Sequence, residues 1–374
     1  MKLTLTILFA AVIVMSAAAQ SSEIEELLDD VGIKPTAMQR GQMDIIGFAS
    51  TAAQMDQVVS QTVTLARPQA DRLSFRYNWN RETSFIAGVC PHDDYEYAGR
   101  LYHLLMPHIK AKRVVIFGVF HKARVFNVED KLIFDSYEAW HGPYGPVQVS
   151  ALRAEILERL PESDYLVDND MQMVEHSVEA IVPWLQQFNR SVEIVSILVP
   201  YMNWETMDSR ASDLASALST IILENDWNLG EDVAFISSAD AVHYGDAGWG
   251  GSDFADFGVD VPGYQKAVDR DVSLAEMYLT GPVTADKLRG FLHSCADAED
   301  VKQYKISWCG RFSIPFGLNV ASRVVAELEG RPLTGYLLDY GSSVSEASLE
   351  VEGIGVTAPN NLHHWVGYAA IGYR

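Results

Sequence analysis

Three of the ten histidines in this chain follow strand-like runs of apolar residues. The histidines and the runs before them are His92 after residues 85–90, His121 after 113–120 and His243 shortly after 233–238. Continuous Val, Ile and Phe runs are typical of strands buried in a parallel sheet. Ligands bind beyond the carboxyl ends of such strands. The three imidazoles are therefore expected to meet at one patch, and imidazole is the commonest metal ligand in proteins.

Carboxylates stand beside two of these histidines. Asp93 and Asp94 follow His92 directly, and Asp240 precedes His243 by three residues. Carboxylate oxygens either bind a metal or orient an imidazole through a hydrogen bond. These acidic residues therefore strengthen the prediction of a metal site.

A further histidine, His176, lies between Glu175 and Ser177 at the start of a predicted helix. Two interpretations remain open. In the first, Glu175 and Ser177 cap the positive end of that helix and His176 has no chemical role. In the second, His176 points into the same pocket as an acid-base group.

The three cysteines are Cys90, Cys295 and Cys309. Cys309 lies in a Trp-Cys-Gly-Arg sequence, and its thiolate would suit ferrous iron, cuprous copper or zinc. A disulfide between Cys295 and Cys309 is the alternative. Cys90 is expected to be a small buried residue rather than a ligand.

The first nineteen residues have the composition of an export signal. Lys2 precedes an apolar stretch over residues 3–15, and small residues fill positions 16–19. The stretch is too short to span a bilayer, and no later run approaches that length. We therefore expect an exported protein, periplasmic or extracellular, without a membrane span.

Residues 20–80 predict an acidic, partly helical lead-in, and residues 81–374 predict one domain. Apolar runs alternate with helical patterns there, which indicates a three-layer α/β/α fold around a mixed, mainly parallel sheet. The expected strands are 85–90, 113–120, 192–199, 233–238 and a short one at 305–308. The expected helices are 97–109, 151–159, 175–188, 204–224 and 314–328. Residues 337–345 are expected to form loops around short strands, and residues 365–373 a last strand that closes the sheet.

Composition and motifs exclude several classes of protein. The formal charge of −22 and the dispersed Lys and Arg residues argue against nucleic-acid binding. The sequence has no P-loop, no dinucleotide fingerprint, no serine-hydrolase elbow and no paired-cysteine zinc motif.

Five motifs, in order along the chain, resemble those of the Memo family, the B component of the AmmeMemoRadiSam system. The resemblance extends from about Gln39 to the C-terminus. The motifs are Pro91-His92-Asp93-Asp94-Tyr95-Glu96-Tyr97-Ala98-Gly99, Phe117-Gly118-Val119-Phe120-His121, Glu175-His176-Ser177-Val178-Glu179, Ser237-Ser238-Ala239-Asp240-Ala241-Val242-His243-Tyr244-Gly245 and Cys309-Gly310-Arg311. Asp93 and Asp94 replace Ala and Gly of the family pattern, and Ala239 is an extra residue that could displace Asp240.

The resemblance implies a fold shared with class III extradiol dioxygenases and a redox-metal pocket. It implies iron or copper, with zinc as a third candidate, on His92, His121 and Cys309. We expect His243 to act as a general base or proton shuttle oriented by Asp240, and His176 to polarise a substrate or oxygen.

Taken together, these features predict a metal-dependent redox enzyme with an unidentified small-molecule or peptide substrate. The alternatives are ring cleavage like that of the extradiol dioxygenases, a non-catalytic metal- or peptide-binding module, and a structural protein with a vestigial site.

Overall fold

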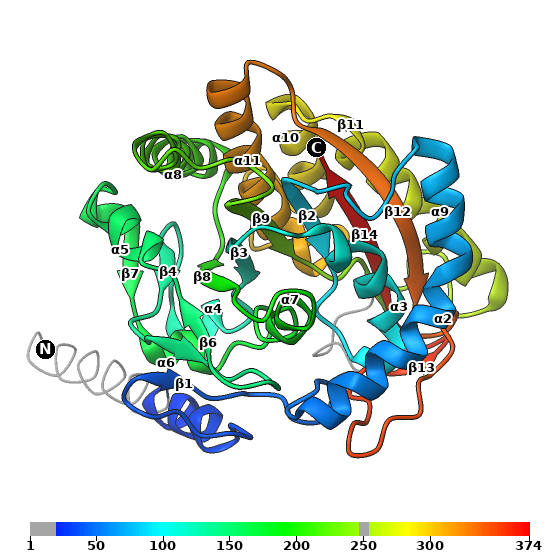
Figure 1. The fold of residues 1–374 in the computed structure, drawn as a ribbon. Coiled ribbons are helices and arrows are strands. Elements are labelled where there is room, and N and C mark those ends of the chain that lie inside the picture. Colours follow the sequence, from blue (N-terminus) through cyan, green and yellow to red (C-terminus); the bar gives the residue numbers. More distant parts are fainter. Residues whose placement is uncertain (1–19, 247–253) are drawn as a thin grey trace, which may run out of the picture.

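The computed structural model describes residues 20–246 and 254–374 (Figure 1). The predicted export signal lies outside the described residues, as does part of the glycine-rich stretch after His243. None of the helices in the described ranges is both long enough and apolar enough to cross a membrane.

A large mixed sheet forms the middle of the molecule, in the order β1-β5-β6-β8-β3-β9-β2-β14-β12-β11. Neighbouring strands from β6 to β2 all pair in parallel, whereas β14, β12 and β11 pair antiparallel. The strands on this path are β1 Gln39–Arg40, β5 Ala139–Trp140, β6 Val147–Val149, β8 Glu193–Val199, β3 Arg113–Val119, β9 Val233–Ser238, β2 Ala87–Cys90, β14 His364–Tyr373, β12 Thr334–Ser342 and β11 Gly281–Pro282. Off this path lie β4 Leu132–Phe134, β7 Tyr165–Val167, β10 His243–Gly245 and β13 Asn360–Asn361.

Helices cover both faces of the sheet (Figure 1). Helix α3, Tyr95–Leu105, packs on β2, β14 and β12, and α2, Ala52–Tyr77, lies outside it. Helix α11, Ser313–Glu329, packs on β9, β3, β8 and β2, with α8, Trp204–Glu224, and α10, Ala285–Cys295, beside it. Further α-helices are α4 Ala123–Phe126, α5 Leu152–Leu157, α6 Asn169–Met173, α7 Val182–Phe188 and α9 Val261–Leu274, and residues 20–29 are helical as well. This arrangement confirms the predicted three-layer fold.

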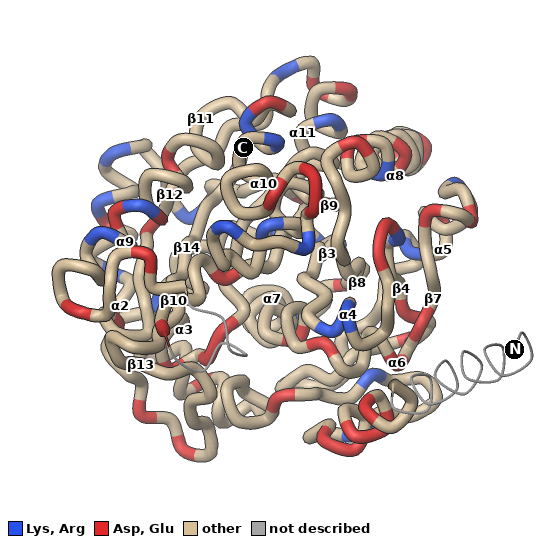
Figure 2. The backbone as a smooth tube through the Cα atoms, turned by 180° about the vertical axis from the view of Figure 1, so that it is seen from behind, with Lys and Arg blue, Asp and Glu red and all other residues tan. Residues whose placement is uncertain are grey.

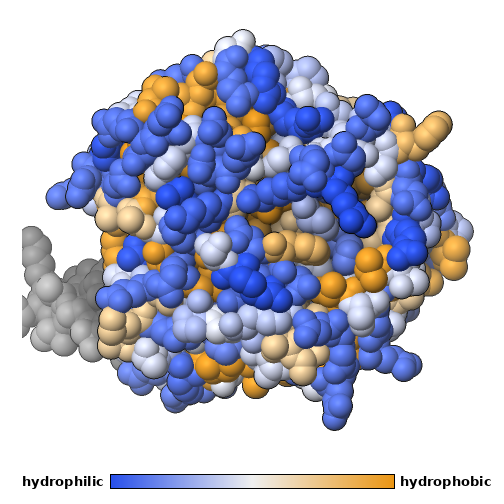
Figure 3. Space-filling view, in the orientation of Figure 1, coloured by the Kyte–Doolittle hydropathy of each residue, from blue (hydrophilic) through white to orange (hydrophobic). Residues whose placement is uncertain are grey.

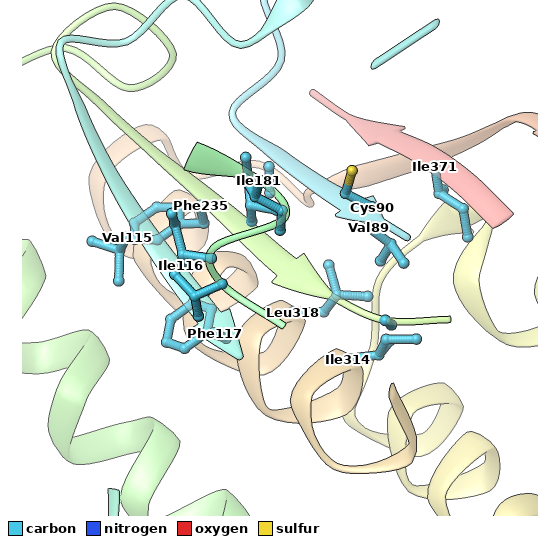
Figure 4. Packing of buried hydrophobic residues seen from close by; sticks show 14 of the residues in the cluster. Val89, Cys90, Val115, Ile116, Phe117, Ile181, Phe235, Ile314, Leu318 and Ile371 are labelled. Atoms are coloured by element: carbon cyan, nitrogen blue, oxygen red, sulfur yellow. The ribbon is translucent and has the colours of Figure 1, made fainter. Parts of the chain in front are cut away.

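Apolar side chains from both helical layers meet the strands in one core (Figure 4). Ile181 approaches from the side of α7, and Ile314 and Leu318 approach from α11. All three are buried, as are Val115 and Phe117 of β3. Residues of β3 are apolar on both faces because both faces are covered.

The face drawn in Figure 3 is mainly hydrophilic, with small scattered apolar patches. Acidic residues are spread along the chain among fewer Lys and Arg residues (Figure 2).

The prediction of a helix from Glu175 was wrong. Residues 175–176 have no regular structure, residues 177–181 form turns, and the helix begins only at Val182. The backbone carbonyl of Glu175 accepts a hydrogen bond from Arg40, and its carboxylate accepts from the backbone N–H groups of His121 and Ser177. These tertiary bonds hold the segment outside a helical ladder, so Glu175 and Ser177 do not cap a helix.

Three strand predictions also need correction. The strand expected at 305–308 is absent, and only an isolated bridge joins Val242 to Trp308. Residues 337–345 were expected to form loops around short strands, but residues 337–342 belong to the long strand β12. The C-terminal strand exists, but β14 lies between β2 and β12 inside the sheet and β11 occupies the edge. Helix α3 covers β14. The side chains of β14 are nearly all buried, as expected of an inner strand.

Candidate metal centre

His92 follows β2 and lies buried beneath the end of β9. Its Nδ1 is 2.8 Å from the hydroxyl oxygen of Ser238, which itself donates to the carbonyl oxygen of Ser177 at 2.6 Å. Because the single hydroxyl hydrogen is used in that second bond, Ser238 accepts from Nδ1–H of His92. Burial, and then the neighbouring imidazoles, lower the pKa of His92, so the ring is neutral. Its Nε2 therefore carries a lone pair, and this buried atom has no hydrogen-bond partner among the described residues.

His121 follows β3 and is oriented by Glu175. The carboxylate accepts from the backbone N–H of His121 at 2.7 Å and from Nδ1 at 2.9 Å. Burial alone would raise the pKa of Glu175, but His121, through its charge and its hydrogen bond, holds that pKa well below the usual range. A charged carboxylate on Nδ1 leaves Nε2 available as a ligand atom, an arrangement common around metal-binding histidines.

Close packing at Gly118 brings the Glu175 segment to the end of β3. A Cβ atom at Gly118 would lie 2.6 Å from the side chain of Val178 and 2.9 Å from the hydroxyl of Ser177. A larger residue would push this segment away from His121.

Cys309 and Asp240 approach the site from the other direction. The thiol sulfur is 2.9 Å from Nε2 of His243, and one oxygen of Asp240 accepts from the backbone N–H of His92 at 2.9 Å. A Cβ atom at Gly310 would lie 2.2 Å from the side chain of Ala239. This close approach keeps Cys309 beside Asp240.

Burial largely determines the protonation states of Cys309 and His243. Burial, and then the charge of Asp240, raise the pKa of the Cys309 thiol well above its usual value. Burial, and then His121, lower the pKa of His243 to about 3. At neutral pH the thiol donates a hydrogen bond to the neutral imidazole. Asp240 and His243 are close without sharing a helical turn, with 3.9 Å between a carboxylate oxygen and Nε2.

His176 lies against His121. The two rings stack with centroids 4.7 Å apart and an interplanar angle of 10°. Nδ1 of His176 is 3.8 Å from Glu175, too far for a hydrogen bond. Burial, and then His121, lower the pKa of His176 to about 4. The imidazole faces the common pocket, although no helix starts there.

Two groups of ligand atoms are close enough to share one cation. The atoms of His92, His121 and His176 lie within 4.8 Å of one another, and so do those of His92, Asp240 and Cys309. The predicted trio of His92, His121 and Cys309 is thus divided between two groups that share His92. The three cysteines are free, so the alternative of a Cys295–Cys309 disulfide was wrong.

A family model described as "Memo-like protein" matches residues 49–352. The chain belongs to the Memo-like family. It is 30% identical over 213 residues to a MEMO1 family protein of Methanosarcina barkeri, covering 55% of this chain and 73% of that protein. A MEMO1 family protein of Archaeoglobus fulgidus is 32% identical over 167 residues, 44% of this chain and 57% of its own length. One from Pyrobaculum arsenaticum is 30% identical over 165 residues, 42% and 53% respectively.

In this Memo-like chain a cavity of about 490 Å³ opens onto the histidines. Besides the site residues, its lining includes Asp44, Asp93 and Asp94. Asp93 accepts from the hydroxyl of Tyr368 at 2.8 Å, and burial, followed by the charge of Asp94, raises the pKa of Asp93 to about 7. This cavity, here called the acidic cavity, presents carboxylates on one side of the imidazoles.

Asp94 holds one wall of the acidic cavity in place through hydrogen bonds. Its carboxylate accepts from the backbone N–H groups of Thr357 and Ala358 at 2.6 Å and 2.8 Å. It also accepts from the Thr357 hydroxyl at 2.9 Å. The Asp93-Asp94 pair therefore joins the first strand-end histidine to a loop near the C-terminus.

Sequence reasoning missed the residues that orient the imidazoles. Ser238 appeared only as part of a motif, and Glu175 only as part of a motif and as a possible helix cap. Ser238 is the last residue of β9 and β9 pairs with β2, so its position one strand from His92 was the available signal. The turn at Glu175 had no such signal, because its conformation depends on Arg40 and Gly118.

Proposed function

We propose that this chain binds one redox-active metal ion through His92, His121 and Cys309 and works as an iron- or copper-dependent redox enzyme. Zinc is the third candidate. The observation that carries the proposal is the buried Nε2 of His92, whose lone pair has no hydrogen-bond partner in the described part of the chain. Nitrogen atoms in such positions ordinarily find a donor, because a buried polar atom without a partner is costly. A cation would satisfy it.

The neighbouring groups fit a cation better than a hydrogen bond. A carboxylate oxygen of Asp240 lies 3.3 Å from Nε2 of His92. Burial, and then the charge of Asp93, raise the pKa of Asp240 well above its usual value, because an ionised carboxylate is costly in a buried site without a cation. A bound cation would stabilise the ionised carboxylate and bind the lone pair of Nε2. Imidazole, thiolate and carboxylate together suit iron and copper.

The protein supplies orientation and proton handling around the metal. When bound, iron or copper would supply one-electron chemistry and the capacity to activate dioxygen. Ser238 and Glu175 hold the two imidazoles in the tautomer that turns Nε2 to the pocket. His243 accepts the thiol hydrogen of Cys309, Asp240 borders both, and His176 lies where it can polarise a substrate.

A second candidate function is ring cleavage of the extradiol type, which uses two histidines and a carboxylate. The closeness of Asp240 to His92 favours it, since Asp240 could take the carboxylate role in place of Cys309. A metal- or peptide-binding module without turnover would use the same pocket. Oxygen consumption by the metal-loaded protein separates the enzymes from the module.

Export is part of the proposal and rests on the sequence of residues 1–19. A host that secretes the chain should release a mature form starting near Gln20, as measured by N-terminal mass spectrometry. Recovery of the uncleaved chain in the cytoplasm would contradict export.

The experiment that tests the metal site is metal content after anaerobic loading with ferrous iron, cuprous copper or zinc. Wild type is compared with His92→Ala, His121→Ala and Cys309→Ser. We expect about one tightly bound ion per chain in the wild type, and at least 100-fold weaker binding in each variant, since removing a metal ligand costs more than removing the partner that orients it.

A control variant and a comparison of two ligand variants separate the proposed trio from its alternatives. His108→Ala is the matched control, because this half-buried histidine bonds the backbone of Thr83 on another part of the surface. If Asp240→Asn abolishes binding while Cys309→Ser does not, the carboxylate site is correct and the thiolate site is wrong. Equal binding by all variants would refute a metal function.

A further inference from the structure

A second cavity, of about 270 Å³, lies on the other side of His121. It reaches both His121 and Cys309, whereas the acidic cavity reaches His121 but not Cys309. Its charged lining residues are Arg124 of α4 and Arg311, which follows Cys309 and Gly310. We call it the arginine cavity. It gives the thiol a separate approach from solvent.

Both arginines face the same aromatic ring. The guanidinium carbon of Arg311 lies 3.5 Å from the centroid of Tyr304, and that of Arg124 lies 5.5 Å from it. Tyr201 links them further, because its hydroxyl accepts from Nε of Arg124 at 3.0 Å and from the hydroxyl of Tyr304 at 2.9 Å. Two cationic groups and two phenols therefore converge on one small space.

The arginines lack the partners that normally neutralise them. Among the described residues neither guanidinium forms an ion pair with a carboxylate, although Lys302 beside them pairs with Glu129 at 2.6 Å. Nε of Arg311 is buried and has no hydrogen-bond partner there. In a chain with 50 acidic and 28 basic residues, two unneutralised arginines at one cavity indicate a site for an external anion.

The remaining walls are apolar and partly aromatic. Phe120 and Phe312 line the cavity together with Val119 and Pro200. Its volume of about 270 Å³ is slightly below the range typical of drug-sized small-molecule sites, about 300–1,000 Å³, and therefore suits a small ligand. A flat ring carrying one anionic group matches this combination of size, walls and charge.

We propose that the arginine cavity binds a small aromatic carboxylate. Its carboxylate lies between Arg124 and Arg311, and its ring packs against Tyr201 and Phe312 beside Cys309. The inference deepens the proposed function by naming a substrate class, and it rests on that function for the chemistry that follows binding. Binding itself needs only the cavity.

The test is calorimetric titration of the protein as isolated with benzoate, with benzamide as the uncharged ring of the same shape. We expect benzoate to bind and benzamide to bind at least about tenfold more weakly, since a charge-assisted hydrogen bond contributes one to two factors of ten to affinity. Equal binding of the two probes, or no binding of benzoate, overturns the proposal.

Two variants locate the site. Arg124→Gln and Arg311→Gln should each weaken benzoate binding by about tenfold or more. Arg124 is exposed, so its substitution does not threaten folding, whereas Arg311 is partly buried. Arg67→Gln, at an exposed position of α2, is the charge-matched control and should bind as the wild type does. Unchanged binding in both cavity variants overturns the proposal.

Two additional measurements distinguish the aromatic carboxylate site from a general oxyanion site and from the metal site. Inorganic phosphate should displace benzoate poorly, and equal affinity for phosphate would overturn the aromatic assignment. Metal content measured on the same Arg124→Gln sample should match that of the wild type. If the wild type binds metal but not benzoate, this inference fails alone, whereas a wild type that binds benzoate but no metal refutes the proposed function.

Discussion

The two cavities that meet at His121 are lined by opposite kinds of ionisable side chain, acidic in one and basic in the other. Four carboxylates, Asp44, Asp93, Asp94 and Asp240, line the acidic cavity, and the described part of that lining includes no Lys or Arg. The arginine cavity has Arg124 and Arg311 and no carboxylate among its described lining residues. Two of the 28 Lys and Arg residues of the chain thus lie together on one side of the candidate metal centre.

This difference shows that the electrostatic environment of the site depends on where individual charged residues lie, and not on the net charge of the chain. Arg311 lowers and Asp240 and Asp93 raise the pKa of the Cys309 thiol, although burial has the largest effect. The two cavities therefore act on the same sulfur with opposite sign. This balance sets how readily the thiol becomes a thiolate, which is the form that binds a metal.

The largest effect is expected at the Ser238 hydroxyl, which orients the His92 imidazole beside the acidic cavity. Ser238→Ala removes the acceptor of Nδ1–H, so the ring is free to adopt the tautomer with Nε2 protonated. We expect metal affinity to fall by about 10- to 100-fold in competition titrations. Ser219→Ala is the control, because that buried hydroxyl has no hydrogen-bond partner in the described structure. Equal effects of the two variants would show a packing defect instead.

The opposed charges predict opposite shifts in pH dependence. The thiol of Cys309 is protonated at neutral pH and must lose its proton to bind a metal. Affinity should therefore rise with pH, by up to about tenfold per unit while the thiol remains protonated. Arg311→Gln should move this rise to higher pH, and Asp93→Asn should move it to lower pH, each by up to about one unit. Metal titrations across the pH range measure these shifts. Shifts of both variants in the same direction would contradict the opposite effects expected of the two cavities.

The smallest effect is expected at the wall of the acidic cavity. Asp94→Asn leaves one acceptor oxygen for three donors, two of them the N–H groups of Thr357 and Ala358. We expect the free energy of local opening to fall by about 1 kcal/mol. Hydrogen-exchange protection of residues 354–360 should therefore fall by about fivefold. Protection of β12 should not change. Unaltered protection at 354–360 would show that Asp94 does not hold this loop.

Much of the fold could be predicted because its elements have strong local patterns. Helix α8 matches its prediction at both ends, and Asn203 caps it by accepting from the backbone N–H of Thr206 at 2.8 Å. Strands β3, β8 and β9 match because they are buried on both faces. The Glu175 turn and the inner position of β14 could not be predicted, since distant partners decide both.

The candidate site divides in the same way. His92 and His121 were predicted from the ends of β2 and β3, because parallel strands present their carboxyl ends at one edge. Asp240 and His243 also lie there. The partners of the imidazoles, Ser238 and Glu175, depend on hydrogen bonds between segments that are far apart in the chain.

The sequence by itself determined the Memo-like family, the three-layer fold and the edge of the sheet where the histidines gather. Apolar periodicity and short motifs are local properties, so they can be recognised along the chain. Only the tertiary structure decided which nitrogen of His92 faces the pocket, and that Arg124 and Arg311 share one cavity beside Cys309. Charge and hydrogen bonding depend on distances in space, and the packing of separate segments sets those distances.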